Sequence, residues 1–196
     1  MLKHLTVNGG NNLRSSLLIL LFVCPVFSAP PDYCITVVCE DTRGGLSVGS
    51  GTVLPGNTVL TARHVLDRPK KVWVIKDGKL VAGSNPVLSM TDDIAKFTCV
   101  TGIDPAVIGT VSPSKNDRVV HFGKSTGKST GCILPYIRIL EDNTLIQRSD
   151  MLCVPGDSGA GVFNDRSELI AVLTSVDWEH KEQLGVPLSV IKEFLK

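Results

Sequence analysis

The pattern of hydrophobic and polar positions predicts many short β-strands. Between residues 35 and 186, short runs of β-branched and other apolar residues alternate with turn residues. The breaks contain glycine, proline, asparagine and aspartate, as in Pro55-Gly56-Asn57 and Lys76-Asp77-Gly78. The predicted strands are residues 35–38, 47–54, 58–61, 72–76, 94–98, 118–122, 132–140, 161–163 and 169–176.

The end of the chain has a different period. Leu188, Ile191 and Leu195 follow one another at spacings of three and four, which places them on one face of a helix. Regular short strands separated by turns favour a sandwich or barrel over a parallel α/β sheet. We therefore expect an all-β fold with a short C-terminal helix.

The N-terminus has the features of a targeting segment. Residues 17–27 form an apolar run of 11 residues, which follows a polar stretch containing Lys3 and Arg14. A transmembrane helix needs about 20 apolar residues, so the run predicts a secretory signal peptide over residues 1–28, cleaved after Ser28. We expect a secreted or periplasmic protein without stable membrane association; an uncleaved anchor through residues 17–27 is the alternative.

Composition and charge narrow the class of function. The chain has 196 residues, of which 43% are hydrophobic and 20% charged, as in an ordinary globular protein and unlike a disordered one. Without residues 1–28, 18 basic residues face 19 acidic ones. A nearly neutral body gives no electrostatic reason to expect nucleic acid as a partner. The remaining 168 residues suit one compact domain or two small lobes.

The cysteines change meaning if the protein is exported. Five would remain after signal cleavage, an odd number, so at least one is free or pairs with another chain. We expect one or two disulfides, with the connectivity open, although the strand predicted at 35–38 would hold Cys34 and Cys39 apart. No Cys-x-x-Cys pair occurs, so neither a metal site nor a cofactor is expected. The five are Cys34, Cys39, Cys99, Cys132 and Cys153.

A glycine-rich stretch invites a phosphate-loop interpretation. The tetrapeptide Gly-Lys-Ser-Thr occurs twice between Gly123 and Thr130. The interval from Gly123 to Gly127 is one residue too short for that motif, and β-branched residues follow instead of a helix. We therefore interpret the stretch as a solvated turn.

Three segments carry candidate chemistry. Glycines flank Ser158 in Pro155-Gly156-Asp157-Ser158-Gly159, which lets backbone amides converge where a carbonyl oxygen gains negative charge. His64 ends a strand-like run, where a rigid element can present a base to a serine hydroxyl. Asp93, preferred over Asp92, directly precedes an apolar run and offers the carboxylate that would orient the imidazole. The other histidines compete poorly: His4 lies in the signal, His121 within a strand pattern and His180 in a charged loop.

The order His, Asp, Ser along the chain differs from that of subtilisins and α/β-hydrolases. Together with the local motifs, it resembles the chymotrypsin/trypsin-like serine protease family over residues 35–196. The motifs are Thr61-Ala62-x-His64, Asp93-Ile94-Ala95 and Gly156-Asp157-Ser158-Gly159.

The resemblance implies both a fold and a set of roles. Two packed antiparallel β-barrels are expected, the first over residues 29–112 and the second over 113–196 with the C-terminal helix. His64, Asp93 and Ser158 would form the catalytic triad in the cleft between them. The backbone amides of Gly156 and Ser158 would form the oxyanion hole.

This sequence departs from the digestive and clotting members of the family. Their activated N-terminus pairs its amine with the acid before the serine, but no such Ile-Val activation site precedes His64 here. The cysteine that brackets the histidine in animal members is also missing. We therefore expect no zymogen switch of that kind, as in compact bacterial and viral relatives.

The resemblance also places a specificity pocket. Its base would be Leu152, six residues before the nucleophile, and its walls would be Thr174, Ser175, Val176 and Gly185. Leu152 predicts an apolar residue before the scissile bond. Asp150, two positions away, is the alternative base and would select lysine or arginine instead.

These observations predict a secreted serine endopeptidase whose partner is a protein or peptide substrate. The alternative is a catalytically silent protease fold that serves as a binding module. The oligomeric state stays open.

Overall fold

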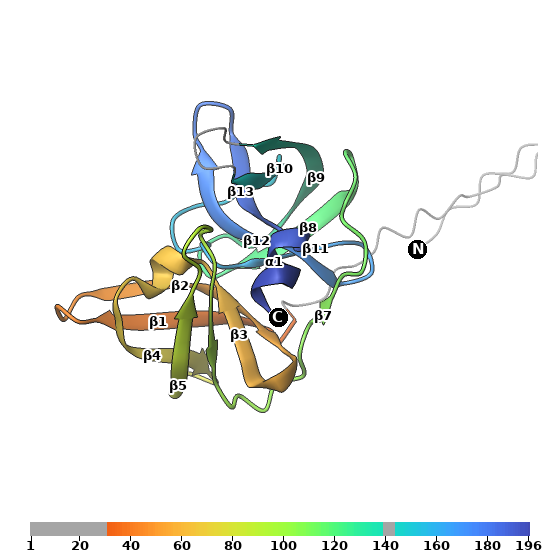
Figure 1. The fold of residues 1–196 in the computed structure, drawn as a ribbon. Helices are drawn as coiled ribbons and strands as arrows, with labels where there is room; N and C mark the ends of the chain where they lie inside the picture. The colour runs from red at the N-terminus through yellow and green to blue at the C-terminus, as the bar shows by residue number, and fades with distance from the viewer. Residues whose placement is uncertain (1–30, 139–143) are drawn as a thin grey trace, which may run out of the picture.

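The structure is a computed structural model that describes residues 31–138 and 144–196. Two β-barrels lie side by side, with a short helix against both (Figure 1). This confirms the expected two-barrel, all-β fold with a C-terminal helix. The predicted signal segment, residues 1–28, lies outside the described residues.

The first barrel closes in the order β1-β2-β3-β6-β5-β4, and every neighbouring pair is antiparallel. Burial alternates along β1, with Ile35, Val37 and Cys39 facing the interior, as a one-sided sheet requires. Its strands are β1 (Cys34–Asp41), β2 (Leu46–Leu54), β3 (Thr58–Thr61), β4 (Pro69–Lys76), β5 (Lys79–Leu88) and β6 (Ala95–Thr98).

The second barrel closes because β11 pairs with both β8 and β12. A further two-residue strand, β7 (Val107–Ile108), runs parallel to β12, so it joins the second sheet although it precedes the boundary predicted at residue 112. The barrel strands are β8 (Arg118–Gly123), β9 (Gly127–Arg138), β10 (Leu145–Ser149), β11 (Gly161–Phe163), β12 (Glu168–Asp177) and β13 (Glu182–Pro187).

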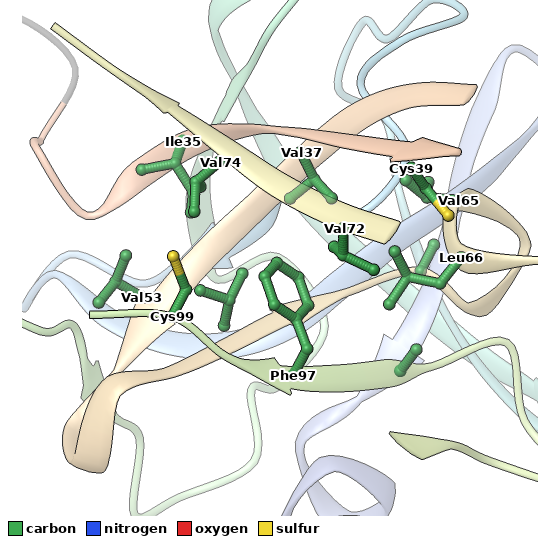
Figure 2. Packing of buried hydrophobic residues seen from close by; sticks show 13 residues of the cluster. Ile35, Val37, Cys39, Val53, Val65, Leu66, Val72, Val74, Phe97 and Cys99 are labelled. Carbon is green, nitrogen blue, oxygen red and sulfur yellow. The ribbon is translucent and has the colours of Figure 1, made fainter. Parts of the chain in front are cut away.

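Each barrel has its own apolar interior, and a third cluster joins them. Figure 2 shows the interior of the first barrel, where Phe97 lies among valines of β1 and β4. The cluster that joins the barrels combines Leu60 and Ile94 of the first with Phe163 of the second and Ile191 of the helix α1 (Leu188–Phe194). This shared cluster fixes the barrels against each other.

The structure contains none of the expected disulfides. All five cysteines of the described residues are unpaired, and Cys39, Cys99 and Cys153 are buried. Cys34 and Cys39 lie five positions apart on the extended strand β1, which separates them and points them to opposite faces. Within residues 31–138 and 144–196, no helix combines the length and hydrophobicity that a membrane crossing requires.

Candidate active site

His64 is presented by a short 3-10 helix, η2 (Arg63–Leu66), that directly follows β3 and Ala62. Val65 and Leu66 are buried in the core of the first barrel. These two side chains anchor the 3-10 helix to the core, and His64 projects outward with half of its side chain exposed.

Asp93 lies in the turn between β5 and β6, where the buried Ile94 fixes the chain. Its carboxylate accepts the backbone amide of His64 at 2.9 Å through Oδ1 and meets the ring Nδ1 at 2.7 Å through Oδ2. An ionised carboxylate only accepts hydrogen bonds, so Nδ1 carries a proton, and in the neutral ring Nε2 is the nitrogen with the lone pair. Burial alone would raise the pKa of Asp93, but these bonds outweigh it and hold the pKa below its usual range.

Asp92, the neighbouring carboxylate, forms hydrogen bonds within its own turn, residues 89–92. It accepts the hydroxyl of Thr91 at 2.6 Å, and its amide donates to the Ser89 hydroxyl at 3.1 Å. The structure thus brings Asp93, and not Asp92, to His64.

Ser158 belongs to the second barrel, but its backbone is hydrogen-bonded to a strand of the first. Its carbonyl accepts the amide of Ser50 on β2 at 2.8 Å. A Cβ built on Gly49 would lie 2.7 Å from Val65 and 2.8 Å from the Ser158 carbonyl, so η2 and Ser158 meet across this glycine. The Ser158 hydroxyl donates to the carbonyl of Thr174 at 3.2 Å, and in the described part of the chain no hydrogen bond joins it to His64.

The backbone before the serine leaves two donors open. Gly156 has φ +101°, a left-handed conformation that favours glycine. Its carbonyl accepts the Ser50 hydroxyl at 3.0 Å. Neither the amide of Gly156 nor that of Ser158 donates a hydrogen bond to any described residue. The loop therefore offers the pair of free N–H groups that an oxyanion hole needs.

A cavity of about 200 Å³ opens beside Ser158. None of its lining side chains is charged, and most are apolar. They are Cys153, Val154, Pro155, Ser158, Leu173, Thr174, Ser175, Val176 and Trp178.

The residues predicted to form the base of a specificity pocket lie outside this cavity. Leu152 does not line the cavity: the residue is 66% exposed, whereas Cys153 lines the cavity and is buried. Gly185 does not line it either; it lies opposite Leu173 in the β12–β13 ladder. Asp150, the alternative base, lies outside the lining and accepts the amide of Cys132 at 2.6 Å. The predicted walls, Thr174 to Val176, do line it.

Several residues of this region could not be predicted from the sequence. Ser50, Cys153 and Trp178 stand in no recognisable motif. Ser50 and Gly156 are 106 positions apart in the chain, and only the docking of the two barrels brings them into contact. No signal in a single sequence could have linked them.

Two other histidines stand apart from this arrangement. His121 on β8 is fully buried, and both of its ring nitrogens lack a hydrogen-bond partner among the described residues. His180 pairs with Asp177 at 2.7 Å on an exposed loop. Across residues 31–138 and 144–196, no three His, Cys, Asp or Glu side chains gather as metal ligands would.

Comparison with solved structures gives the same fold. The Rv3671c protease from M. tuberculosis, in its active form, superposes with a TM-score of 0.74 at 14% identity, over 83% of this chain and 78% of that one. AlgW, an HtrA-type protease solved with a tripeptide, gives 0.72 at 16% identity, over 85% of this chain and 60% of that one. No curated protein matches the sequence.

Family membership follows from the sequence itself. Residues 49–172 match the trypsin-like peptidase domain, a span that includes His64, Asp93 and Ser158 and covers well over half of the chain. The chain therefore belongs to the trypsin-like peptidase family and has the two-barrel fold of its serine proteases.

Proposed function

We propose that the protein is a secreted serine endopeptidase that cleaves peptide bonds through an acyl-enzyme on Ser158. Two observations carry this proposal: the doubly hydrogen-bonded His64–Asp93 pair on one barrel, and on the other a serine loop with two amides that donate to no described residue. His64 acts as the base, Asp93 orients it, and the amides of Gly156 and Ser158 receive the oxyanion.

The reaction begins with a rotation of the Ser158 side chain away from the Thr174 carbonyl and toward Nε2 of His64. Catalytic hydrogen bonds of this kind often tighten only when substrate binds. Ser158 Oγ then attacks the peptide carbonyl while its proton passes to Nε2. The tetrahedral intermediate collapses as His64 protonates the departing amine. Water, deprotonated by His64, hydrolyses the ester and returns the proton to Ser158.

The cavity beside Ser158 supports a preference for an apolar residue before the scissile bond. Its lining contains no carboxylate that would attract lysine or arginine, and Cys153, Leu173 and Val176 present an apolar surface. A single apolar contact of this type discriminates by about 1–3 kcal/mol, so the preference is moderate.

Labelling with a fluorophosphonate, read by intact mass, tests the triad. The wild-type protein should gain one adduct and Ser158→Ala none, because only an activated serine reacts. Peptide libraries should then show cleavage after apolar residues. The intact mass of the exported protein should place its N-terminus directly after Ser28.

One contact favours a second function. The Ser158 hydroxyl rests on Thr174 and not on His64, as would suit a catalytically silent fold that binds a partner. No adduct on a folded, correctly processed wild-type protein would contradict the endopeptidase and support this binding module. A partner bound equally well by wild type and Ser158→Ala would support it further.

A further inference from the structure

The carboxylate of Asp157, directly before the candidate nucleophile, is completely buried yet fully hydrogen-bonded. Oδ1 accepts the amides of Ser125 at 2.8 Å and Thr126 at 3.0 Å. Oδ2 accepts the amide of Val154 at 3.0 Å and also the hydroxyl of Thr126. Three of the four donors come from the β8–β9 turn, residues 123–127.

These hydrogen bonds compensate the energetic cost of burying the negative charge of Asp157. No lysine or arginine of the described residues forms an ion pair with Asp157. His121 lies close by, with its Nε2 4.0 Å from Oδ2, but burial lowers its pKa, so it stays neutral at physiological pH. Burial would raise the pKa of Asp157, but the bonds from Thr126, Val154 and Ser125 together lower it.

The same turn also holds the other end of the serine loop. The amide of Lys124 donates to the Ser50 hydroxyl at 2.9 Å, and that hydroxyl donates to the carbonyl of Gly156 at 3.0 Å. A Cβ at Gly123 would overlap the Asp157 carboxyl group, so the turn backbone approaches as closely as glycine allows. The loop with both candidate oxyanion donors is thus braced at Asp157 and at Gly156.

We propose that Thr126 is a positioning residue that keeps the oxyanion loop in its working shape through Asp157. The proposal rests on the proposed function. The β8–β9 turn does from inside the chain what the freed N-terminal amine does in the zymogen-activated members of the family. The loop is therefore ordered without any cleavage event. The stretch that the sequence analysis interpreted as a solvated turn supports the catalytic loop.

Replacement of Thr126 by valine tests this role, since it removes the hydroxyl and keeps the shape. A hydrogen bond to a charged group is worth about 1.5–3 kcal/mol, which corresponds to a loss of about ten- to a hundredfold in kcat. The KM should change little, because the oxyanion donors act on the transition state more than on bound substrate. The rate of fluorophosphonate labelling should fall in parallel.

Two variants serve as controls. Thr126→Ser restores the hydroxyl and should recover most of the kcat. Thr130→Val makes the same chemical change on β9, at an exposed position of the same hairpin, and should keep the wild-type kcat. A Thr126→Val protein that folds with wild-type kcat, or a Thr126→Ser protein as slow as Thr126→Val, would overturn the proposal.

A second measurement does not depend on activity. In a Ser158→Ala background, carbon NMR of the Asp157 carboxyl group should show a higher pKa after Thr126→Val, because one donor to the carboxylate is lost. An unchanged pKa would overturn the hydrogen bond on which the proposal stands. If wild type neither cleaves nor labels while the pKa rises as expected, the endopeptidase fails and the contact between turn and loop stands.

Discussion

Single residues set the protonation state of the site, and Asp93 is the clearest case. Its two bonds to His64 define which ring nitrogen carries the proton. Asp93→Asn keeps the shape but permits the wrong tautomer, and kcat should fall roughly 10³–10⁴-fold, the scale known for this change in Ser-His-Asp enzymes. Steady-state kinetics on a good peptide substrate measures this. Asp92→Asn, which alters only the neighbouring turn, should leave kcat nearly unchanged; equal losses in both variants would contradict the assignment.

His121 makes stability depend on pH. Because burial lowers its pKa in the folded protein, the unfolded chain binds a proton below about pH 6.5 while the folded one does not. The free energy of unfolding should therefore decrease as the pH is lowered below about 6.5, by at most about 1.4 kcal/mol per pH unit. Calorimetry between pH 7.5 and 5 measures this slope. His121→Leu should lack that part of it; an identical slope would show that other groups cause the dependence.

Some residues of the candidate site could be predicted from the sequence and others could not. His64, Asp93 and Ser158 stand in short local motifs, so their types and order were readable from the chain. Cys153 was not, since the choice between Leu152 and Cys153 as the inward residue depends on how a loop turns. The contact of Thr126 with Asp157 could not be predicted either, because the two lie 31 positions apart and nothing local marks it.

Among the elements, α1 contacts the first barrel through a polar side chain as well as through the shared apolar cluster. Lys96 on β6 donates to the carbonyl of Phe194 at 3.0 Å and lies 5.0 Å from that ring's centroid. Lys96→Met should destabilise the protein by about 1 kcal/mol and loosen the end of α1. Chemical denaturation and hydrogen exchange at the C-terminus measure both effects. Lys79→Met, an exposed change on β5, serves as the control, and an equal effect there would contradict the link.

Four strands, β5, β7, β10 and β13, are absent from the predicted set, and two of them show the physical reason. β5 is mostly exposed and contains Gly83, Asn85 and Pro86, which are turn signals in a single sequence. Glu182 and Gly185 similarly interrupt the pattern of β13. Both strands form because neighbouring strands on either side complete their hydrogen bonds, which is tertiary information.

For the whole molecule, the shared apolar cluster predicts that the two barrels unfold together. Phe163 lies in that cluster, 1% exposed, with its ring 5.2 Å from that of Tyr33. Phe163→Ala should cost about 3–5 kcal/mol and lower the melting temperature of a single transition. Differential scanning calorimetry distinguishes the outcomes: two separate transitions, in wild type or variant, would mean that the barrels fold independently.

The unpaired cysteines determine whether the protein can fold in a reducing compartment. Burial raises the pKa of Cys34 and of Cys153 to about 12, so neither is a thiolate at neutral pH and both resist oxidation. No described cysteine needs a partner for the barrels to close. The two barrels should therefore fold without an oxidoreductase, and a reducing bacterial cytosol should yield them in native form with reductant present throughout.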